Sequence, residues 1–218
     1  MAISADDFDP RQLDPSARAE LRSLTKPTAD LVAQHLVAAG ELLDVNPEKA
    51  LAHARAARSR AGRIGVVREA AGIAAYGAGE WAEALSELRA ARRISGDPRD
   101  LAMMADCERA LGRPRQAIRM LRDPDVRRLD PQTRTELLIV AAGARRDLGE
   151  LDAALTVLAR GGLDTEKPPA GAVRLWYAYA DALVAAGRPD EAARWFAASA
   201  ALDVDGETDA VDRAADLV

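Results

Sequence analysis

The pattern of apolar and polar positions between Arg68 and Ile94 predicts two helices joined by a tight turn. In the first half, small or aromatic apolar residues recur at helical spacing, at Ala71, Gly72, Ala75 and Tyr76. After a glycine-rich turn, apolar residues again share one face, at Trp81, Ala84, Leu85, Leu88 and Ala91. Small residues on both helices allow close packing. One such hairpin cannot bury its own apolar faces, so it needs neighbours.

The same pattern recurs along the chain. An alanine followed four residues later by an apolar residue marks each second helix, at Ala50, Ala84, Ala117, Ala154 and Ala192. Subtracting their residue numbers gives separations of 34, 33, 37 and 38 residues. Five residues before the last four alanines stands a turn glycine, at Gly79, Gly112, Gly149 and Gly187. Seven residues before each of those glycines the residue is small, at Gly72, Ala105, Ala142 and Ala180. The regular recurrence of these alanine, glycine and small-residue positions predicts a helical repeat.

This pattern resembles the tetratricopeptide repeat, whose period is about 34 residues with small residues and an A-x3-F spacing at these places. The resemblance covers roughly residues 28–202 and implies an all-α, right-handed superhelical solenoid of about five helical hairpins with short capping helices at its ends. Segments such as MADCERALGRP and YAYADALVAAGRPDEA also resemble small actinobacterial tetratricopeptide proteins, a group without assigned chemistry.

We therefore expect one stack over residues 13–204, because a solenoid is one continuous domain. An N-terminal helix begins at Asp14-Pro15, and repeats follow near residues 28–62, 63–96, 97–130, 131–170 and 171–204. Residues 1–12 are acidic and expected to be mobile. For residues 205–218 the sequence leaves two alternatives open: a thin acidic capping helix or a frayed acidic tail.

The departures from the repeat pattern also carry predictions. The tryptophan expected early in each first helix occurs once, as Trp176, and Val45 stands where the first repeat should have its turn glycine. Extra residues at the end of the third repeat and in the loop 164–170 account for the two longer spacings. We expect these insertions at the edge of the stack.

Composition narrows the class of protein. The chain has 218 residues, 49% of them apolar but only 4% aromatic, which fits close helix packing around alanine. A net charge of −5 argues against broad, non-specific nucleic-acid binding. Cys107 is the single cysteine, so no intramolecular disulfide forms. The acidic N-terminus does not resemble a signal peptide, and no apolar run approaches a membrane span. We expect a cytoplasmic protein with no membrane partner.

Sequence signatures of catalysis are missing. The only histidines are His35 and His53, and no HExxH or phosphate-binding GK[ST] motif is present. Spacing alone would allow a Cys107–His nucleophile pair, but Cys107 stands among small residues of a repeat helix, where buried packing explains it. His35 is expected near the partner-binding groove, with a hydrogen bond to a carbonyl as the simpler interpretation. We predict a non-catalytic protein with no cofactor and no metal.

The resemblance implies that the first helices of successive repeats line a concave groove that receives an extended peptide or a helix of a partner protein. The repeat register places the following residues there: His35, Ala39, Glu69, Ile73, Tyr76, Arg99, Asp106, Arg109, Glu136, Gly143, Arg146, Arg174, Tyr177 and Asp181. Arg109 and Arg146 occupy equivalent positions, so they could receive a carboxylate bidentately. The alternative is that they pair with Asp106 and Asp147.

A second candidate surface is a run of arginines with no acidic residue between them, at Arg55, Arg58, Arg60, Arg63 and Arg68. Such a basic patch would suit RNA, a ribonucleoprotein or an acidic protein. No aromatic residues are interleaved to stack on bases, and solvated helix faces are the simpler interpretation. A protein or peptide partner is therefore the main prediction, with RNA as the alternative. Alanine-rich end surfaces leave self-association open.

Overall fold

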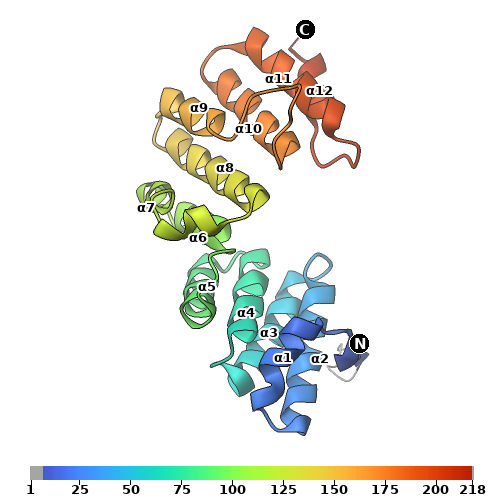
Figure 1. Ribbon diagram of the computed structural model, residues 1–218. Coiled ribbons are helices and arrows are strands. Elements are labelled where there is room, and N and C mark those ends of the chain that lie inside the picture. The colour runs from blue at the N-terminus through green and yellow to red at the C-terminus, as the bar shows by residue number, and fades with distance from the viewer. Residues whose placement is uncertain (1–6, 218) are drawn as a thin grey trace. The chain divides into compact units, whose positions relative to one another are not determined.

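The computed structural model describes residues 7–217, and every regular element within them is a helix (Figure 1). This confirms the predicted all-α helical repeat. The chain divides into two compact units, Met1–Asp100 and Leu101–Val218. The expectation of one continuous stack over residues 13–204 stays a prediction.

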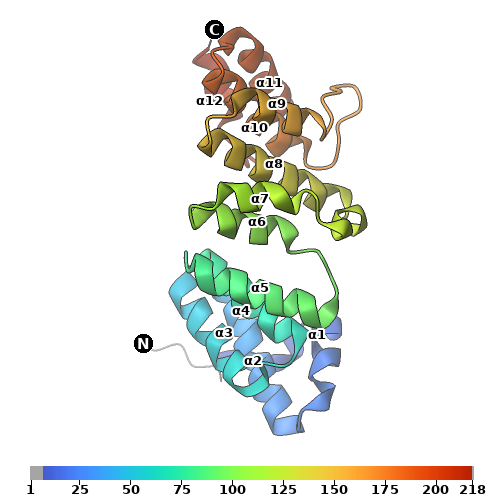
Figure 2. The same ribbon diagram turned by 90° about the vertical axis from the view of Figure 1, so that its left-hand side faces the viewer.

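Unit 1, Met1–Asp100, contains a short N-terminal helical segment and two helical hairpins. Its elements are η2 (Pro10–Gln12), α1 (Pro15–Glu20), η3 (Leu21–Ser23), α2 (Lys26–Leu42), α3 (Pro47–Ala61), α4 (Gly65–Gly77) and α5 (Trp81–Ser95). Helices α2 and α3 form the first hairpin, α4 and α5 the second, and α3 packs on α4 (Figure 2). Two N-caps define helix starts: Asp14 accepts from the Ser16 N–H at 2.8 Å and Asn46 from the Lys49 N–H at 3.1 Å.

The N-terminal segment of unit 1 contacts the first hairpin. Of residues 1–12, expected to be mobile, residues 1–6 lie outside the described residues. The 3-10 helix η2 packs on α2, and the Phe8 ring lies edge-on to His53 of α3 with 5.9 Å between ring centroids. Leu21 is buried against α2, so this segment covers one end of the hairpin, as the sequence predicted for its helix.

Unit 2, Leu101–Val218, contains three hairpins and a terminal helix. Its elements are α6 (Leu101–Ala110), α7 (Pro114–Met120), η4 (Pro124–Arg128), α8 (Pro131–Asp147), α9 (Leu151–Ala159), α10 (Ala172–Ala185), α11 (Pro189–Leu202) and α12 (Ala210–Ala215). The pairs α6–α7, α8–α9 and α10–α11 are the hairpins, and α6 packs on α8 and α8 on α10. Helix α12 packs on α11. The first insertion is the 3-10 helix η4, and the second is the loop between α9 and α10.

A recurring glycine turn joins the two helices of four hairpins. Gly79, Gly112, Gly149 and Gly187 all have φ between 72° and 75°, the left-handed region that suits glycine. The residue after each glycine donates its N–H to a carbonyl five residues earlier at 2.8–2.9 Å, which closes the end of the first helix. The first hairpin has Val45 at this place, 80% exposed, and its chain turns without a positive φ.

The repeat alanines form the inner contact between helices. Ala50, Ala84, Ala117, Ala154 and Ala192 are all 0% exposed. In the second hairpin the helices approach so closely that a Cβ on Gly72 would lie 2.6 Å from a methyl carbon of Leu88. Unit 2 adds large aromatic side chains to this alanine core, chiefly Trp176 and Phe196, which are 1% and 0% exposed.

Within residues 205–217 the chain forms one short helix, α12. Ala210 is buried, and Ala214 and Leu217 pack on the core of unit 2. At helical spacing Val211 and Val218 would share one apolar side of this helix with Ala210 and Ala214. Val211 is instead 67% exposed, and Val218 lies outside the described residues.

Candidate functional site

The first helices of unit 2 are linked by a row of ion pairs, which we call the first-helix ladder. Its members are Arg109, Asp147, Arg146, Asp181 and Arg213. They lie on α6, α8, α10 and α12, so each pair joins the first helix of one repeat to the first helix of the next. This is the face on which the sequence placed the partner-binding residues of these repeats.

Arg109 shows how the ladder is built. Its Nε donates to Asp147 Oδ2 at 2.7 Å and its Nη2 to Asp147 Oδ1 at 3.2 Å, a bidentate contact from α6 to the end of α8. Asp106, one turn earlier on α6, lies 3.6 Å away. A Cβ on Gly143 would lie only 3.2 Å from the Arg109 guanidinium carbon, so the missing side chain makes room for this arginine.

Asp181 is the centre of the ladder. Arg146 Nη1 donates to its Oδ2 at 2.6 Å and Arg213 Nη2 to its Oδ1 at 2.9 Å. Burial on its own would raise the pKa of Asp181, but the hydrogen bonds and charges of Arg213 and Arg146 outweigh burial and lower that pKa below its ordinary value. The Asp181 side chain is still 29% exposed, so solvent, or a ligand, reaches it.

Helix α12 is anchored on the same face by Arg213. Besides Asp181, its guanidinium donates to the Tyr177 hydroxyl at 3.1 Å and lies 4.6 Å from the centroid of the Phe196 ring. Nearby, Arg174 of α10 pairs with Glu136 of α8 at 3.0 Å, and the Arg174 side chain is 57% exposed. Burial raises the pKa of Glu136, which Arg174 partly counteracts.

The sequence predicted that Arg109 and Arg146 would form a ladder open to a carboxylate, with pairing to Asp106 and Asp147 as the alternative. In the structure both arginines already hold a carboxylate. Arg109 forms ion pairs with Asp147 and Asp106, whereas Arg146 forms an ion pair with Asp181 on the next first helix, α10. An external carboxylate must therefore compete with an internal one.

The remaining predicted groove residues lie in unit 1 and do not form a comparable row. Glu69 of α4 lies 3.5 Å from Arg99, and burial raises its pKa. Tyr76 packs edge-on against Trp81 with 5.2 Å between centroids, and Ile73 is partly buried on the same helix. His35 Nδ1 lies 3.0 Å from His53 Nδ1, a contact between two histidines that the sequence did not indicate, and the expected bond of His35 to a carbonyl stays a prediction. Burial lowers the pKa of His53.

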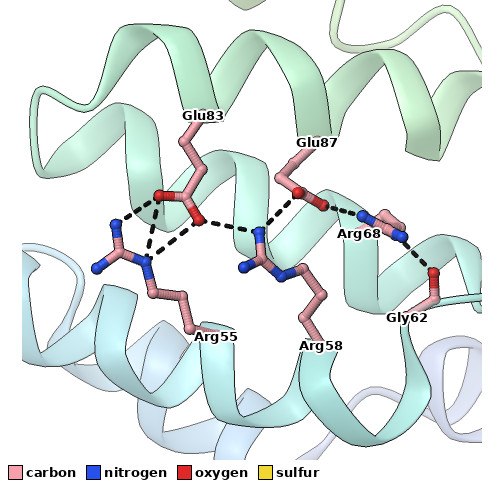
Figure 3. A network of polar contacts seen from close by, with 6 residues as sticks. All are labelled: Arg55, Arg58, Gly62, Arg68, Glu83 and Glu87. Carbon is pink, nitrogen blue, oxygen red and sulfur yellow. Dashed lines mark hydrogen bonds and ion pairs between the residues drawn. The ribbon is translucent and has the colours of Figure 1, made fainter.

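The predicted basic patch of unit 1 is largely neutralised, by a cluster that we call the Glu87 network (Figure 3). Its members are Arg55, Arg58, Arg68, Glu83, Glu87 and the Gly62 carbonyl. Glu87 of α5, whose side chain is 6% exposed, accepts from Arg58 Nη1 at 2.7 Å and from Arg68 Nη1 at 2.8 Å. Arg68 also donates its Nε to the Gly62 carbonyl at 2.6 Å.

This network corrects the expectation of a row of unneutralised cations. Glu83 pairs with Arg55 and Arg58, and the hydrogen bond from Arg55 lowers the pKa of Glu83. No acid interrupts residues 55–68 in the sequence, but both glutamates come from α5, about one repeat later. Only two members of the run stay outside the network: Arg60, which donates to the Ala56 carbonyl, and Arg63, which is exposed.

Cys107 and the two histidines come from different units of the chain. Cys107 is 0% exposed within the core of unit 2, whereas both histidines belong to unit 1. Within residues 7–217 no group of three or more histidine, cysteine, aspartate or glutamate side chains is arranged to hold a metal ion. Across the same residues, no helix is long and apolar enough to cross a bilayer.

Sequence reasoning missed two members of the first-helix ladder. Arg213 lies in the segment for which the sequence leaves a capping helix and an acidic tail open, and the sequence offers Asp147 only as an alternative partner of the arginines. A partial signal was available for Asp147, which directly follows Arg146 at the end of the predicted first helix. For Arg213 the signal was that it is the only basic residue among residues 203–216.

Successive antiparallel helix pairs with a common glycine turn and buried repeat alanines define the fold as a helical repeat of the tetratricopeptide type. The fold is similar to the solved structure of YrrB, described as a TPR protein with an unusual peptide-binding site. The match covers 92% of this chain and 96% of that one, with a TM-score of 0.52 and 20% sequence identity, so the likeness is one of fold. No protein-family profile matches the sequence. No curated protein matches it significantly.

Proposed function

We propose that this protein is a non-catalytic adaptor that binds a peptide or helix of a partner protein along the first helices α6, α8 and α10 of unit 2. The observation that carries the proposal is the first-helix ladder. Its arginines and carboxylates alternate from one repeat to the next, and their side chains are 29–39% exposed. A buried structural network would not leave both partners accessible.

An extended peptide offers both backbone donors and backbone acceptors, and an alternating row of cations and carboxylates can bind both kinds of group. Tyr177 adds a partly exposed aromatic ring beside Asp181, which suits an apolar side chain of the ligand. YrrB, a protein of similar fold, has a peptide-binding site, and we extend peptide binding to this chain as part of the proposal.

The alternative, RNA binding through residues 55–68, receives less support. Three of its five arginines are held by Glu83 and Glu87, so a phosphate would have to displace a carboxylate that is nearly buried. The complete burial of Cys107, which leaves its thiol inaccessible to a substrate, supports the non-catalytic part of the proposal.

A random peptide library displayed on phage tests the proposal without knowledge of the natural partner. The wild-type chain and two charge-matched variants are panned in parallel. The ladder variant is Arg109→Gln with Arg146→Gln, and the control is Arg160→Gln with Arg194→Gln, which are exposed at the end of α9 and on α11. Circular dichroism establishes that each variant is folded.

We expect the wild type and the control to enrich the same peptides and the ladder variant to lose them. Enrichment of those peptides by the ladder variant would place binding elsewhere. If the folded wild type enriches no peptide, the adaptor proposal itself fails.

A further inference from the structure

Unit 2 carries a second charged surface, which we call the α7 surface. It consists of four arginines on α7 and in the segment that follows: Arg115, Arg119, Arg122 and Arg127. All four are exposed, and none forms an ion pair with a carboxylate of unit 2 within the described residues. Two more arginines flank them, Arg113 paired with Glu108 at 3.4 Å and Arg128 paired with Asp125 at 3.2 Å.

The local structure explains why these side chains project together. Ala117 is buried, and Ile118 and Leu121 pack on the core formed with α6 and α8, which fixes the inward side of α7. Arg115 and Arg119 stand four residues apart on α7 and therefore project from the same side of that helix, and Arg122 follows just after its end. Residues 113–128 contain six arginines and two aspartates, a local charge of +4 in a chain of net charge −5.

The contrast with residues 55–68 shows what is unusual about this surface. There, a neighbouring helix supplies glutamates that neutralise the arginines. At the α7 surface no described element of unit 2 does so, and the four arginines, which lie within 13 residues of each other along the chain, all face water. The guanidinium group of arginine binds carboxylates and phosphates bidentately, so these exposed arginines would suit an anionic partner.

The residue types of the α7 surface favour one kind of anionic partner over an acidic protein or a single-stranded nucleic acid. A protein partner normally buries an aromatic or aliphatic anchor. None of the strongly exposed large apolar residues of the described chain belongs to this segment, and residues 113–128 contain no aromatic residue. Proteins that bind single strands combine basic residues with aromatic stacking platforms, which are missing here. Binding to the phosphates of a duplex needs only the charges.

We propose that the α7 surface binds the phosphate backbone of double-stranded nucleic acid, without reading its sequence. The net negative charge of the chain does not prevent this, because charges beyond a Debye length, about 8 Å at physiological salt, are largely screened. Binding should be weak and strongly dependent on salt. This surface is separate from the first-helix ladder, so the two proposals stand or fall independently.

The test is fluorescence anisotropy of a short labelled RNA duplex with the full chain, titrated at several salt concentrations. Four phosphate contacts predict a slope of log K against log salt of about −3.6, or about a hundredfold weaker binding at 200 mM than at 50 mM salt. The variant Arg115→Gln, Arg119→Gln, Arg122→Gln should bind at least about tenfold more weakly, with a slope of about −0.9. A DNA duplex should behave similarly.

The matched control removes the same charge elsewhere in unit 2: Arg160→Gln, Lys167→Gln, Arg194→Gln, all exposed positions. It should keep the wild-type slope, as should the ladder variant Arg109→Gln with Arg146→Gln. Equal losses in the α7 variant and the control would overturn the proposal, because net charge alone would explain them. Stronger binding to polyglutamate, to phosphatidylserine vesicles or to the single strand would overturn it too, since the partner would be another class.

Discussion

Both units connect neighbouring repeats through ion pairs, but they use different helices to do so. In unit 1 the Glu87 network joins α3 to α5, the second helices of their hairpins, with Arg68 of α4 added. In unit 2 the first-helix ladder joins α6, α8, α10 and α12. The central carboxylates also differ in burial, with Glu87 6% exposed and Asp181 29% exposed.

This difference in burial separates a structural role from a binding role. A nearly buried carboxylate that loses its cations cannot recover the lost interaction from water, so the Glu87 network is fixed once the unit has folded. An accessible carboxylate can exchange a protein cation for water or a ligand at small cost. We therefore expect the Glu87 network to contribute more to stability than the first-helix ladder, for which we proposed a binding role, and the following predictions test that difference.

The largest effect is expected for Glu87→Ala. It leaves Arg58 and Arg68 without their shared acceptor, and breaking a buried pair typically costs about 3–5 kcal/mol. Since both arginines are about 30% exposed, we expect a loss of about 3 kcal/mol in the free energy of unfolding of unit 1. Urea denaturation, with hydrogen exchange to localise the change to α3–α5, measures it. Glu87→Gln should cost less, because it keeps an acceptor of the same shape.

Asp181→Ala should destabilise unit 2 by about 1 kcal/mol, since it removes two charge-assisted hydrogen bonds that are partly exposed. Its matched control is Asp190→Ala, at an exposed position of α11, with an effect within about 0.5 kcal/mol. If Asp181→Ala proves as costly as Glu87→Ala, the contrast between the two networks is wrong.

Arg213→Met keeps the aliphatic stem of the side chain but loses the bonds to Tyr177 and Asp181 and the contact with the Phe196 ring. We expect a local loss of about 0.5–1 kcal/mol, seen as faster amide exchange in residues 210–216. Faster exchange throughout unit 2 would contradict the view that Arg213 anchors only α12. Asp216→Asn, an exposed change in the same segment, is the control.

A smaller effect is expected when the ladder is titrated with acid. The pKa of Asp181 is lowered in the folded state, so its contribution to stability is present above the ordinary pKa of an aspartate, about 3.9. It is lost as the pH falls through the lowered folded value. The stability difference between the wild type and Asp181→Asn should therefore shrink as the pH is reduced below about 4. A difference that stays constant down to about pH 2 would contradict the ion pairs.

The smallest effect on stability should come from the titration of His53. Both histidines of the chain belong to unit 1, so a stability change around the pKa of histidine is expected for unit 1 and not for unit 2. Burial lowers the pKa of His53, so the unfolded state binds the proton more readily than the folded state. Relative to His53→Gln, the wild type should lose stability as the pH falls below about 6.5, the ordinary histidine value. Urea midpoints of both proteins between about pH 8 and pH 5 measure this. Parallel curves would contradict a lowered pKa of His53, because the folded and unfolded states would then bind the proton equally well.

The repeat itself could be predicted because its signals are local. Gly112 and Gly187 adopt the positive φ of the turn that their position predicted, and Ala117 and Ala192 are completely buried. Each of these properties depends on residues within one or two helical turns along the chain. Asp14 likewise caps the helix whose start the Asp14-Pro15 pair predicted.

The charged sites could not be predicted in the same way. The sequence correctly listed Arg109 and Arg146 on the first helices but could not choose their partners, which are 38 and 35 residues away. It grouped Arg55, Arg58 and Arg68 as a basic patch because no acid stands between them. The α7 surface, whose exposed arginines have no carboxylate partner within the described residues of unit 2, was overlooked because two aspartates interrupt it.

The helices, their turns and the small residues on which they pack followed from the order of residues alone, since these features depend on short-range geometry and on burial of apolar faces. Which charges are neutralised and which remain open to a partner became clear only once the helices had been placed side by side. The physical reason is that an ion pair depends on a few ångströms between side chains from different helices, and the order of residues along the chain does not set that distance.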